Sequence, residues 1–283
     1  MGKVNMPGII PVAGMTSEFG TEWDASLVPV APNYTAIEAA IYECLHVGCT
    51  SIWIIANDDV APLIRHRIGS WTTDAYSMVR AKFTMYPSDH HQEVPIYYAP
   101  IHPRHRKRVD NYAWSSLWGC NVAYWVMKRF SRWAKPTQYY ISFPLGVIDA
   151  HEIREYRSTM RTNAPFYFSH NGKTVKDGLP ISFTIDPEEW RRAKHIITRN
   201  ASMWVSTNSQ GPPTEKLPIE ERYISRKYGL KEVFGGSERG IEQELKCFYD
   251  LTTWGGYVTL LSSELGGRMK RPTTKIMYRG RKR

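Results

Sequence analysis

Short apolar runs alternate with amphipathic segments over the first two thirds of the chain. The runs are bounded by Gly, Pro or polar residues, which predicts buried strands over residues 8–13, 51–56, 94–99 and 138–143. Apolar residues spaced three and four apart predict helices over residues 35–47, 60–68, 112–133 and 149–160, and residues 74–86 are helical or mixed. Strands that alternate with helices build a mainly parallel sheet. The pattern therefore predicts one large α/β domain.

The pattern changes after residue 165. Two extended segments, Phe166–His170 and Ile181–Ile185, flank Asn171-Gly172, a pair typical of a tight β-hairpin turn. We therefore expect an antiparallel hairpin, followed by a helix over residues 187–197.

The pattern of the C-terminal third is weaker. Residues 206–218 have the composition of a loop or hinge. Ser237, with Glu238 in the first turn, predicts a capped helix through Phe248, and residues 257–261 predict a short strand. We divide the chain into an α/β domain (1–205), a small, mostly helical region packed on it (206–267) and a basic tail (268–283).

Three motifs in the N-terminal two thirds resemble those of the sugar-1-phosphate nucleotidyltransferases. The family signature Ala-Gly-x-Gly-Thr-Arg-Phe is matched by residues 13–19, which read Ala-Gly-Met-Thr-Ser-Glu-Phe. Its Pro-Lys-x-Leu-Leu-Pro-Val is matched by residues 24–30, and its Phe-x-Glu-Lys-Pro by residues 183–187. The resemblance covers residues 8–190 and implies a three-layer, Rossmann-like domain of the glycosyltransferase-A type with a mainly parallel mixed sheet.

The motifs keep apolar and turn residues and lose charged ones. Glu18 stands where the family has a triphosphate-binding arginine, Ala25 replaces a lysine, and Ile185-Asp186 replaces a glutamate–lysine pair. The family's reaction depends on cationic and metal stabilisation of phosphate groups. A misplaced charge 4 Å from a phosphate costs roughly 4 kcal/mol at an effective dielectric near 20. We therefore expect that pyrophosphorylase activity has been lost, unless Glu18 holds a metal ion.

The glycine turn after the first strand implies a nucleotide site, because backbone N–H groups in such loops bind phosphate. The residues concerned are Val12, Ala13, Gly14, Met15, Thr16 and Ser17. The resemblance implies Glu18 and Asp149 as catalytic residues, and Asp149 and Asp250 as metal ligands. The implied cofactor is a Mg²⁺ or Mn²⁺ ion with a nucleotide sugar. Asp149 also fits a second role, as the cap of the helix that follows it.

The net charge of +10 is unevenly distributed. The tail from residue 268 holds eight basic residues and no acidic one: Arg268, Lys270, Arg271, Lys275, Arg279, Arg281, Lys282 and Arg283. A second cluster is expected in a loop, and its candidate contacts are Arg104, Arg106, Lys107 and Arg108. Such clusters are typical of nucleic-acid contacts. A solvated tail or an acidic protein partner explains the tail equally well.

Other features set limits on the function. Four cysteines without CxxC spacing fit a reducing compartment. Neither a signal peptide nor a run of about 18 apolar residues is recognisable, so we expect no membrane partner and a cytoplasmic location, in a host cell or virion if a virus encodes the chain. Asp89-His90-His91 is a weak metal motif, and Asn57-Asp58-Asp59 follows a strand at the end where such sheets bind ligands.

Two functions fit these observations. The first is a transferase that binds a nucleotide or nucleotide sugar and performs a different transfer, such as glycosyl transfer to nucleic acid. The second is a non-catalytic protein that keeps the shape as a structural, assembly or nucleic-acid-binding module, for example in a virus. The oligomeric state is left open.

Overall fold

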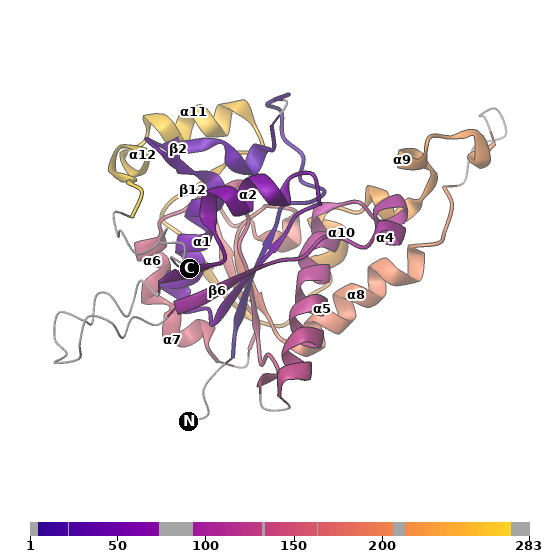
Figure 1. The fold of residues 1–283 in the computed structure, drawn as a ribbon, viewed down its shortest axis with the longest axis horizontal. Coiled ribbons are helices and arrows are strands. Elements are labelled where there is room, and N and C mark those ends of the chain that lie inside the picture. The colour runs from indigo at the N-terminus through magenta and orange to yellow at the C-terminus, as the bar shows by residue number, and fades with distance from the viewer. Residues whose placement is uncertain are drawn as a thin grey trace.

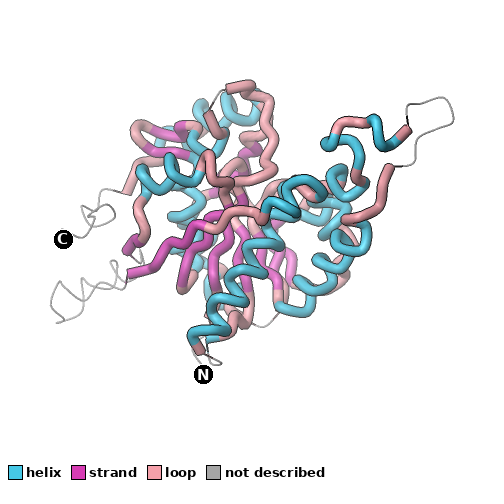
Figure 2. Tube along the Cα trace, turned by 45° about the vertical axis from the view of Figure 1, so that its right-hand side comes forward, coloured by secondary structure: helices cyan, strands magenta, loops and turns pink. Residues whose placement is uncertain are grey.

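The centre of the molecule is an eight-stranded mixed sheet with the order β11-β9-β10-β7-β1-β4-β6-β5. The computed structural model describes residues 5–21, 23–73, 93–131, 134–162, 164–205 and 213–272. Figure 2 shows the strands crossing the middle of the fold. The strands are β1 (Pro7–Pro11), β4 (Ser51–Ile55), β5 (Trp71–Thr73), β6 (Glu93–Tyr98), β7 (Tyr139–Ile141), β9 (Phe166–Ser169), β10 (Phe183–Ile185) and β11 (Ile241–Glu244).

The middle of the sheet is parallel. Strand β1 pairs in parallel with both β4 and β7, and β4 pairs in parallel with β6. All residues of β1 and β4 are buried, which explains why they are continuous apolar runs in the sequence. Strands β10 and β9 extend the sheet as the expected antiparallel pair, and Asn171 and Gly172 both have positive φ at its turn. The predicted three-layer α/β fold with a mainly parallel sheet is confirmed.

Helices cover both faces of the sheet (Figure 1). Helices α1 (Ala36–Val47), α6 (Ala150–Glu155) and α7 (Arg157–Met160) pack together on one face. Helices α5 (Tyr112–Phe130) and α8 (Pro187–Asn200) pack together on the other, with α10 (Leu230–Phe234) beside them. The remaining helical segments are α2 (Ala61–Ile68), α4 (Pro103–Arg108), α9 (Ile219–Arg222) and the 3₁₀ turns at Ala25–Leu27, Val175–Asp177, Thr214–Lys216 and Ile224–Lys227.

A second, smaller core lies beside the main sheet. Two short antiparallel pairs build it with helices α11 (Trp254–Ser262) and α12 (Glu264–Arg268). The pairs join β2 (Pro29–Ala31) to β3 (Tyr34–Thr35) and β8 (Gly146–Ile148) to β12 (Phe248–Asp250). Met15 packs against this core, so the loop after β1 lies between the two cores.

The predicted helix from Ser237 to Phe248 is wrong. This segment forms β11, which pairs in parallel with β9, and then β12. Gly240 has a φ of +124°, which no α-helix contains, so the chain must leave a helical path there. Pairing with β9 at the edge of the sheet therefore determines the conformation of this segment, and the helix-capping pattern of Ser237-Glu238 does not. The domain boundary at 206 stays a prediction, although β11 belongs to the main sheet.

The predicted strand over residues 257–261 is also wrong, because this segment lies in α11. The side chain of Thr253 accepts from the N–H of Gly256 and caps the helix. Leu260 is buried while Val258 and Leu261 are about half exposed, a one-sided burial typical of a surface helix. Five mostly apolar residues carry no period that separates the two conformations.

Two further expectations need correction. The basic cluster at 104–108 is helix α4 rather than a loop, with Pro103 in its first turn and the imidazole of His102 accepting from the N–H of Arg104. The helix expected over residues 149–160 is broken at Tyr156 into α6 and α7. None of the described helices is long and apolar enough to cross a membrane. Residues 74–86 and Asp89-His90-His91 lie outside the described residues.

Candidate nucleotide-binding site

The loop after β1, residues 12–19, carries the nucleotidyltransferase-like signature and is called the signature loop below. It begins with two hydrogen bonds to the end of β4, since the N–H groups of Val12 and Ala13 both donate to the carbonyl of Ile55 at 2.9 Å. Gly14 then turns the chain with a φ of +73°. The loop therefore starts at the carboxyl ends of two parallel strands, where sheets of this class bind ligands.

Only glycine fits at residue 14. A Cβ atom there would lie 2.7 Å from the backbone carbon of Asn111, at the start of α5. The hydroxyl of Ser115, in the first turns of α5, donates a short hydrogen bond to the carbonyl of Ala13. Asn111 itself caps α5 by accepting from the N–H of Trp114 at 2.7 Å. The signature loop is thus held directly against the N-terminus of a 19-residue helix.

Four backbone N–H groups of the signature loop donate to no atom of the described residues: that of Phe19 at its end, and those of Gly14, Thr16 and Ser17 around the turn. Met15 donates to Val12 and Glu18 donates to Thr252. Thr16 is exposed, and Gly14 and Ser17 are partly exposed. Consecutive or nearly consecutive free N–H groups beside a helix N-terminus form a site suited to an anion.

Glu18 forms local contacts with the second core. Its carboxylate accepts from the N–H of Trp254 at 3.2 Å, and its own N–H donates to the carbonyl of Thr252 at 2.9 Å. The neighbouring Phe19 packs edge-on against Trp254 and Tyr257, with ring centroids 5.5 and 5.4 Å apart. Where the family has a cation for phosphate, this chain has a carboxylate that ties the signature loop to the start of α11.

Asp250 lies beside a buried hydroxyl that the sequence did not reveal. One oxygen of Asp250 accepts from both the N–H and the hydroxyl of Thr252, at 2.9 and 2.7 Å, and shapes the turn after β12. Burial raises the pKa of Tyr112 well above its ordinary value, and the carboxylates of Asp24 and Asp250 raise it further. The hydroxyl of Tyr112 is buried and has no hydrogen-bond partner among the described residues.

Tyr112 follows Asn111, so this hydroxyl and the two aspartates belong to the neighbourhood of the signature loop. Tyr112 and Asp24 are functional candidates that sequence analysis missed. The only signal was positional: Asp24 opens the second motif, and Tyr112 is in the first turn of a long helix.

Asp149 lies in a different neighbourhood. Its carboxylate accepts from the N–H of His151 at 2.9 Å and caps α6, as the alternative reading expected. It lines a pocket of about 340 Å³ between α1, α6 and α12, together with Tyr42, His151 and Arg268. Next to that pocket, burial together with the neighbouring His151 and Arg154 lowers the pKa of His46 to about 4.

The two predicted metal ligands have local roles in the fold. One oxygen of Asp250 accepts hydrogen bonds from Thr252, and Asp149 caps α6. The described residues contain no group of three or more His, Cys, Asp or Glu side chains that could hold a metal ion. The role of Asp149 and Asp250 as metal ligands stays a prediction.

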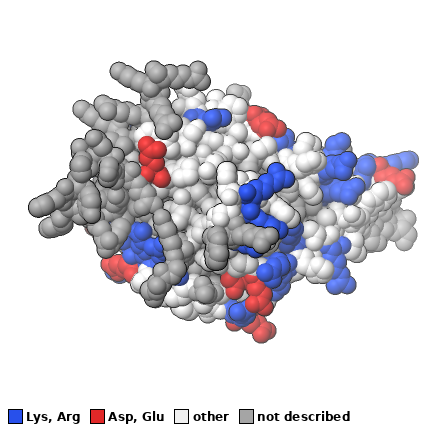
Figure 3. Space-filling view, turned by 60° about the horizontal axis from the view of Figure 1, so that its bottom comes forward, with Lys and Arg blue, Asp and Glu red and all other residues white. Residues whose placement is uncertain are grey.

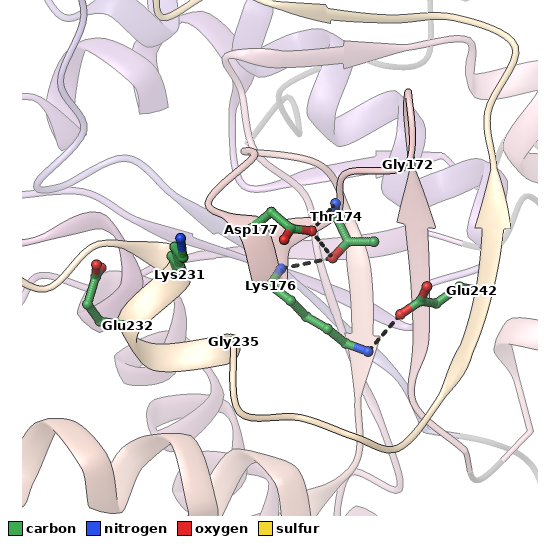
Figure 4. A pocket seen from close by; sticks show the side chains of 8 residues that line it. All are labelled: Gly172, Thr174, Lys176, Asp177, Lys231, Glu232, Gly235 and Glu242. Carbon is green, nitrogen blue, oxygen red and sulfur yellow. Dashed lines mark hydrogen bonds and ion pairs between the residues drawn. The ribbon is translucent and has the colours of Figure 1, made fainter.

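A larger depression lies at the far edge of the sheet (Figure 4). It measures about 550 Å³ and lies between the turn at Val175–Asp177, α10 and β11. Lys176 forms an ion pair with Glu242 at 2.8 Å, and Asp177 accepts from the N–H of Thr174 at 3.0 Å. Because these charged groups are paired with one another, the depression is less suited to a ligand than the signature loop.

The predicted nucleic-acid contacts fall into two groups. On α4, Arg106 pairs with Asp58 at 2.8 Å and Arg108 approaches the hydroxyl of Ser202 at 3.5 Å, while Arg104 and Lys107 are exposed. In the tail, Arg268 pairs with Glu264 and Arg271 with Glu38, and Lys270 lines the pocket beside Asp149. The other tail residues lie outside the described residues: Lys275, Arg279, Arg281, Lys282 and Arg283.

Comparison with solved structures decides the fold. A protein described as a glucose-1-phosphate thymidylyltransferase of Bacillus anthracis superposes with a TM-score of 0.54 over 94% of this chain and 96% of its own length, at 11% sequence identity. The fold is that of the sugar-1-phosphate nucleotidyltransferases. A UDP-glucose pyrophosphorylase of Acinetobacter baumannii matches at a TM-score of 0.46 and 11% identity, over 94% of this chain and 96% of that one. No model of a known family and no curated protein matches the chain.

Proposed function

We propose that this protein binds a nucleotide or nucleotide sugar at the signature loop, with the phosphates on the free N–H groups of Gly14, Thr16 and Ser17. That set of unused donors is the observation on which the proposal depends. A phosphate group there would accept hydrogen bonds from the loop and lie near the positive end of the α5 dipole. Backbone donors bind anions without a cationic side chain, so the loss of the family's arginine does not remove this site.

The reaction we propose is glycosyl transfer rather than pyrophosphorolysis. An acceptor hydroxyl would attack the anomeric carbon of the sugar, the bond from that carbon to the diphosphate would break, and a carboxylate would take the hydroxyl proton. We assign this role to Asp250 or Asp24, whose charges both act on the buried hydroxyl of Tyr112 next to Asn111. Asp149 caps α6 and lines the pocket beside α1, so we do not assign it this role.

A second function has an observation in its favour. Both Glu18 and Asp250 are engaged in local hydrogen bonds that shape the second core. A non-catalytic binding or assembly protein would retain such contacts for stability. It would bind the nucleotide without turning it over, or would not bind it at all.

Calorimetric titration with UDP-, dTDP- and CDP-sugars, with Mg²⁺ or Mn²⁺ and without either, tests the proposal. We expect heat of binding for at least one donor. Gly14→Ala should abolish it, because the new Cβ meets the backbone of Asn111. Gly20→Ala is the matched control, since Gly20 also has a positive φ, +56°, but its Cβ would meet nothing within 4 Å. Thermal unfolding of both variants confirms that they fold.

The absence of heat with every donor and triphosphate would overturn the proposal. Equal binding by Gly14→Ala and wild type would place the ligand elsewhere. Binding without release of nucleoside diphosphate in the presence of candidate acceptors would favour the non-catalytic alternative.

A further inference from the structure

Besides the basic tail, several segments of the chain contain Lys and Arg but no acidic residue, although the chain has 27 Asp and Glu in total. Three of them are residues 94–109, 111–148 and 190–214, and each carries four Lys or Arg. The first includes α4, the second α5, and the third most of α8. A surface shared by these three helices therefore carries an excess of positive charge.

The structure brings the three helices to one side of the sheet. The ammonium group of Lys194 on α8 donates to the side chain of Asn121 on α5 at 2.8 Å, and the indole of Trp190 donates to the carbonyl of Leu117 at 3.2 Å. Arg108 joins α4 to the segment after α8 through Ser202. In Figure 3 most of the visible Lys and Arg side chains lie from the centre to the right, the side on which Figure 1 shows α4 and α8, and a few Asp and Glu side chains lie among them. We call this surface the α4–α5–α8 face.

Most of the cations on this face are not neutralised by the protein. Within the described residues, none of the following forms an ion pair: Arg104, Lys107, Lys128, Arg129, Arg191 and Arg199. All six are exposed. On α8, Arg191, His195 and Arg199 are spaced four apart and therefore form one exposed stripe.

Aromatic side chains lie among these cations. Trp125 on α5 is 51% exposed, and Phe130 at the end of α5 is 77% exposed. The ammonium group of Lys128 lies 4.8 Å from the ring centre of Trp125. An exposed aromatic ring beside unpaired cations suits a nucleobase joined to a phosphate.

We propose that the α4–α5–α8 face binds single-stranded nucleic acid, with phosphates on the Arg and Lys side chains and bases stacked on Trp125 and Phe130. A duplex hides the faces of its bases, so it would use the cations but not the rings. An acidic protein would likewise have no use for the rings. Helix α5 is about 28 Å long at 1.5 Å per residue, enough for a strand of several nucleotides. The proposal does not depend on nucleotide binding at the signature loop.

Fluorescence anisotropy with a labelled 15-mer of deoxythymidine tests it, over a range of salt concentrations. We expect Trp125→Ala to weaken binding roughly fivefold or more at fixed salt, the loss of one stacked base. Trp125→Phe keeps a ring and should retain most of the affinity. Arg129→Gln with Arg191→Gln should lower the slope of log K against log salt by about 1.4, roughly 0.7 for each lost phosphate contact.

The matched control for charge is Lys173→Gln with Lys231→Gln, two exposed lysines at the far edge of the sheet, and it should change neither quantity. No binding by the wild-type chain at low salt would overturn the proposal. Equal binding by Trp125→Ala and wild type would also overturn it, because the face would then serve as a general polyanion or acidic-protein surface. Heparin that competes as strongly as the unlabelled 15-mer would also overturn the proposal, because heparin has no bases to stack on the rings.

Discussion

The signature loop and the α4–α5–α8 face are the two surfaces that we propose to bind anions, and they are built by opposite means. The loop uses backbone N–H groups fixed by Gly14 and by the N-terminus of α5, and it has no cationic side chain from the family motif. The face uses exposed cations on three helices and no special backbone geometry. The comparison therefore predicts that replacing charged motif residues abolishes the family's reaction and leaves a backbone-built anion site in place.

The same difference predicts how the two surfaces respond to mutation. A single added methyl group should disable the loop, because its donors are held by one tight contact. Single substitutions on the face should have small effects that add, since separated charges act independently.

The largest effect is expected in the core between α1 and the sheet, where Glu43 of α1 is buried. Tyr140 and Ser182 donate to its carboxyl group, and burial raises its pKa to about 7, from an ordinary value of 4.5. A raised carboxyl pKa means that the folded state binds the proton more tightly, so Glu43 favours folding below about pH 4.5. This contribution falls as the pH rises to 7, by about 3 kcal/mol at most.

Glu43→Gln should remove that pH dependence, because the amide does not ionise. His46 acts in the opposite direction, since its lowered pKa makes the folded state more stable as the pH rises from about 4 to its ordinary value of 6.5. Urea unfolding of both proteins at several pH values isolates Glu43 as the difference between them. A difference that stays constant from pH 4.5 to 7 would contradict the raised pKa.

The next largest effect is expected on the rate of transfer, when Asp250 is replaced. If Asp250 accepts a proton during transfer, Asp250→Asn should lower the rate of nucleoside diphosphate release about 100-fold and leave donor affinity within a few fold. Asp149→Asn should change neither quantity, because asparagine also caps α6. Steady-state kinetics with the donor found by calorimetry measures both. A large loss of rate in Asp149→Asn and none in Asp250→Asn would contradict this assignment and indicate that Asp149 is the catalytic carboxylate.

The smallest effect concerns Glu18. Glu18→Arg removes the hydrogen bond to Trp254 and places a cation beside the loop, so triphosphate binding should tighten up to about tenfold. Glu18→Gln, which keeps an acceptor, is the control and should change binding less. Calorimetry with UTP and dTTP measures the change. Weaker, metal-dependent binding by Glu18→Arg would instead show that Glu18 organises a cation.

Much of this molecule could be predicted from its sequence. The buried parallel strands, the long helix α5 and the turn at Asn171-Gly172 follow from local periodicity and turn chemistry. Strand β11 could not be predicted, because its conformation depends on pairing with β9, about 75 residues away. The prediction of a strand over residues 257–261 was wrong for a related reason, since a short apolar run fits a strand or a helix.

The site was predicted only in part. The motif located Gly14 and the loop, because a glycine turn after a strand is a local signal. It could not show that Tyr112 and Asp24 lie near Asp250, since these residues meet only through the fold. It also could not show that Glu18 bonds to the start of α11 rather than to a ligand.

The most direct test of the central claim follows the amide of Gly14 during titration. In protein labelled with ¹⁵N-glycine, a nucleotide sugar bound at the loop should shift the Gly14 amide signal strongly, because its N–H gains a phosphate acceptor. The amide of Gly172, at the distant hairpin turn, should not move. A Gly14 signal that stays in place while the donor saturates the protein would contradict the account.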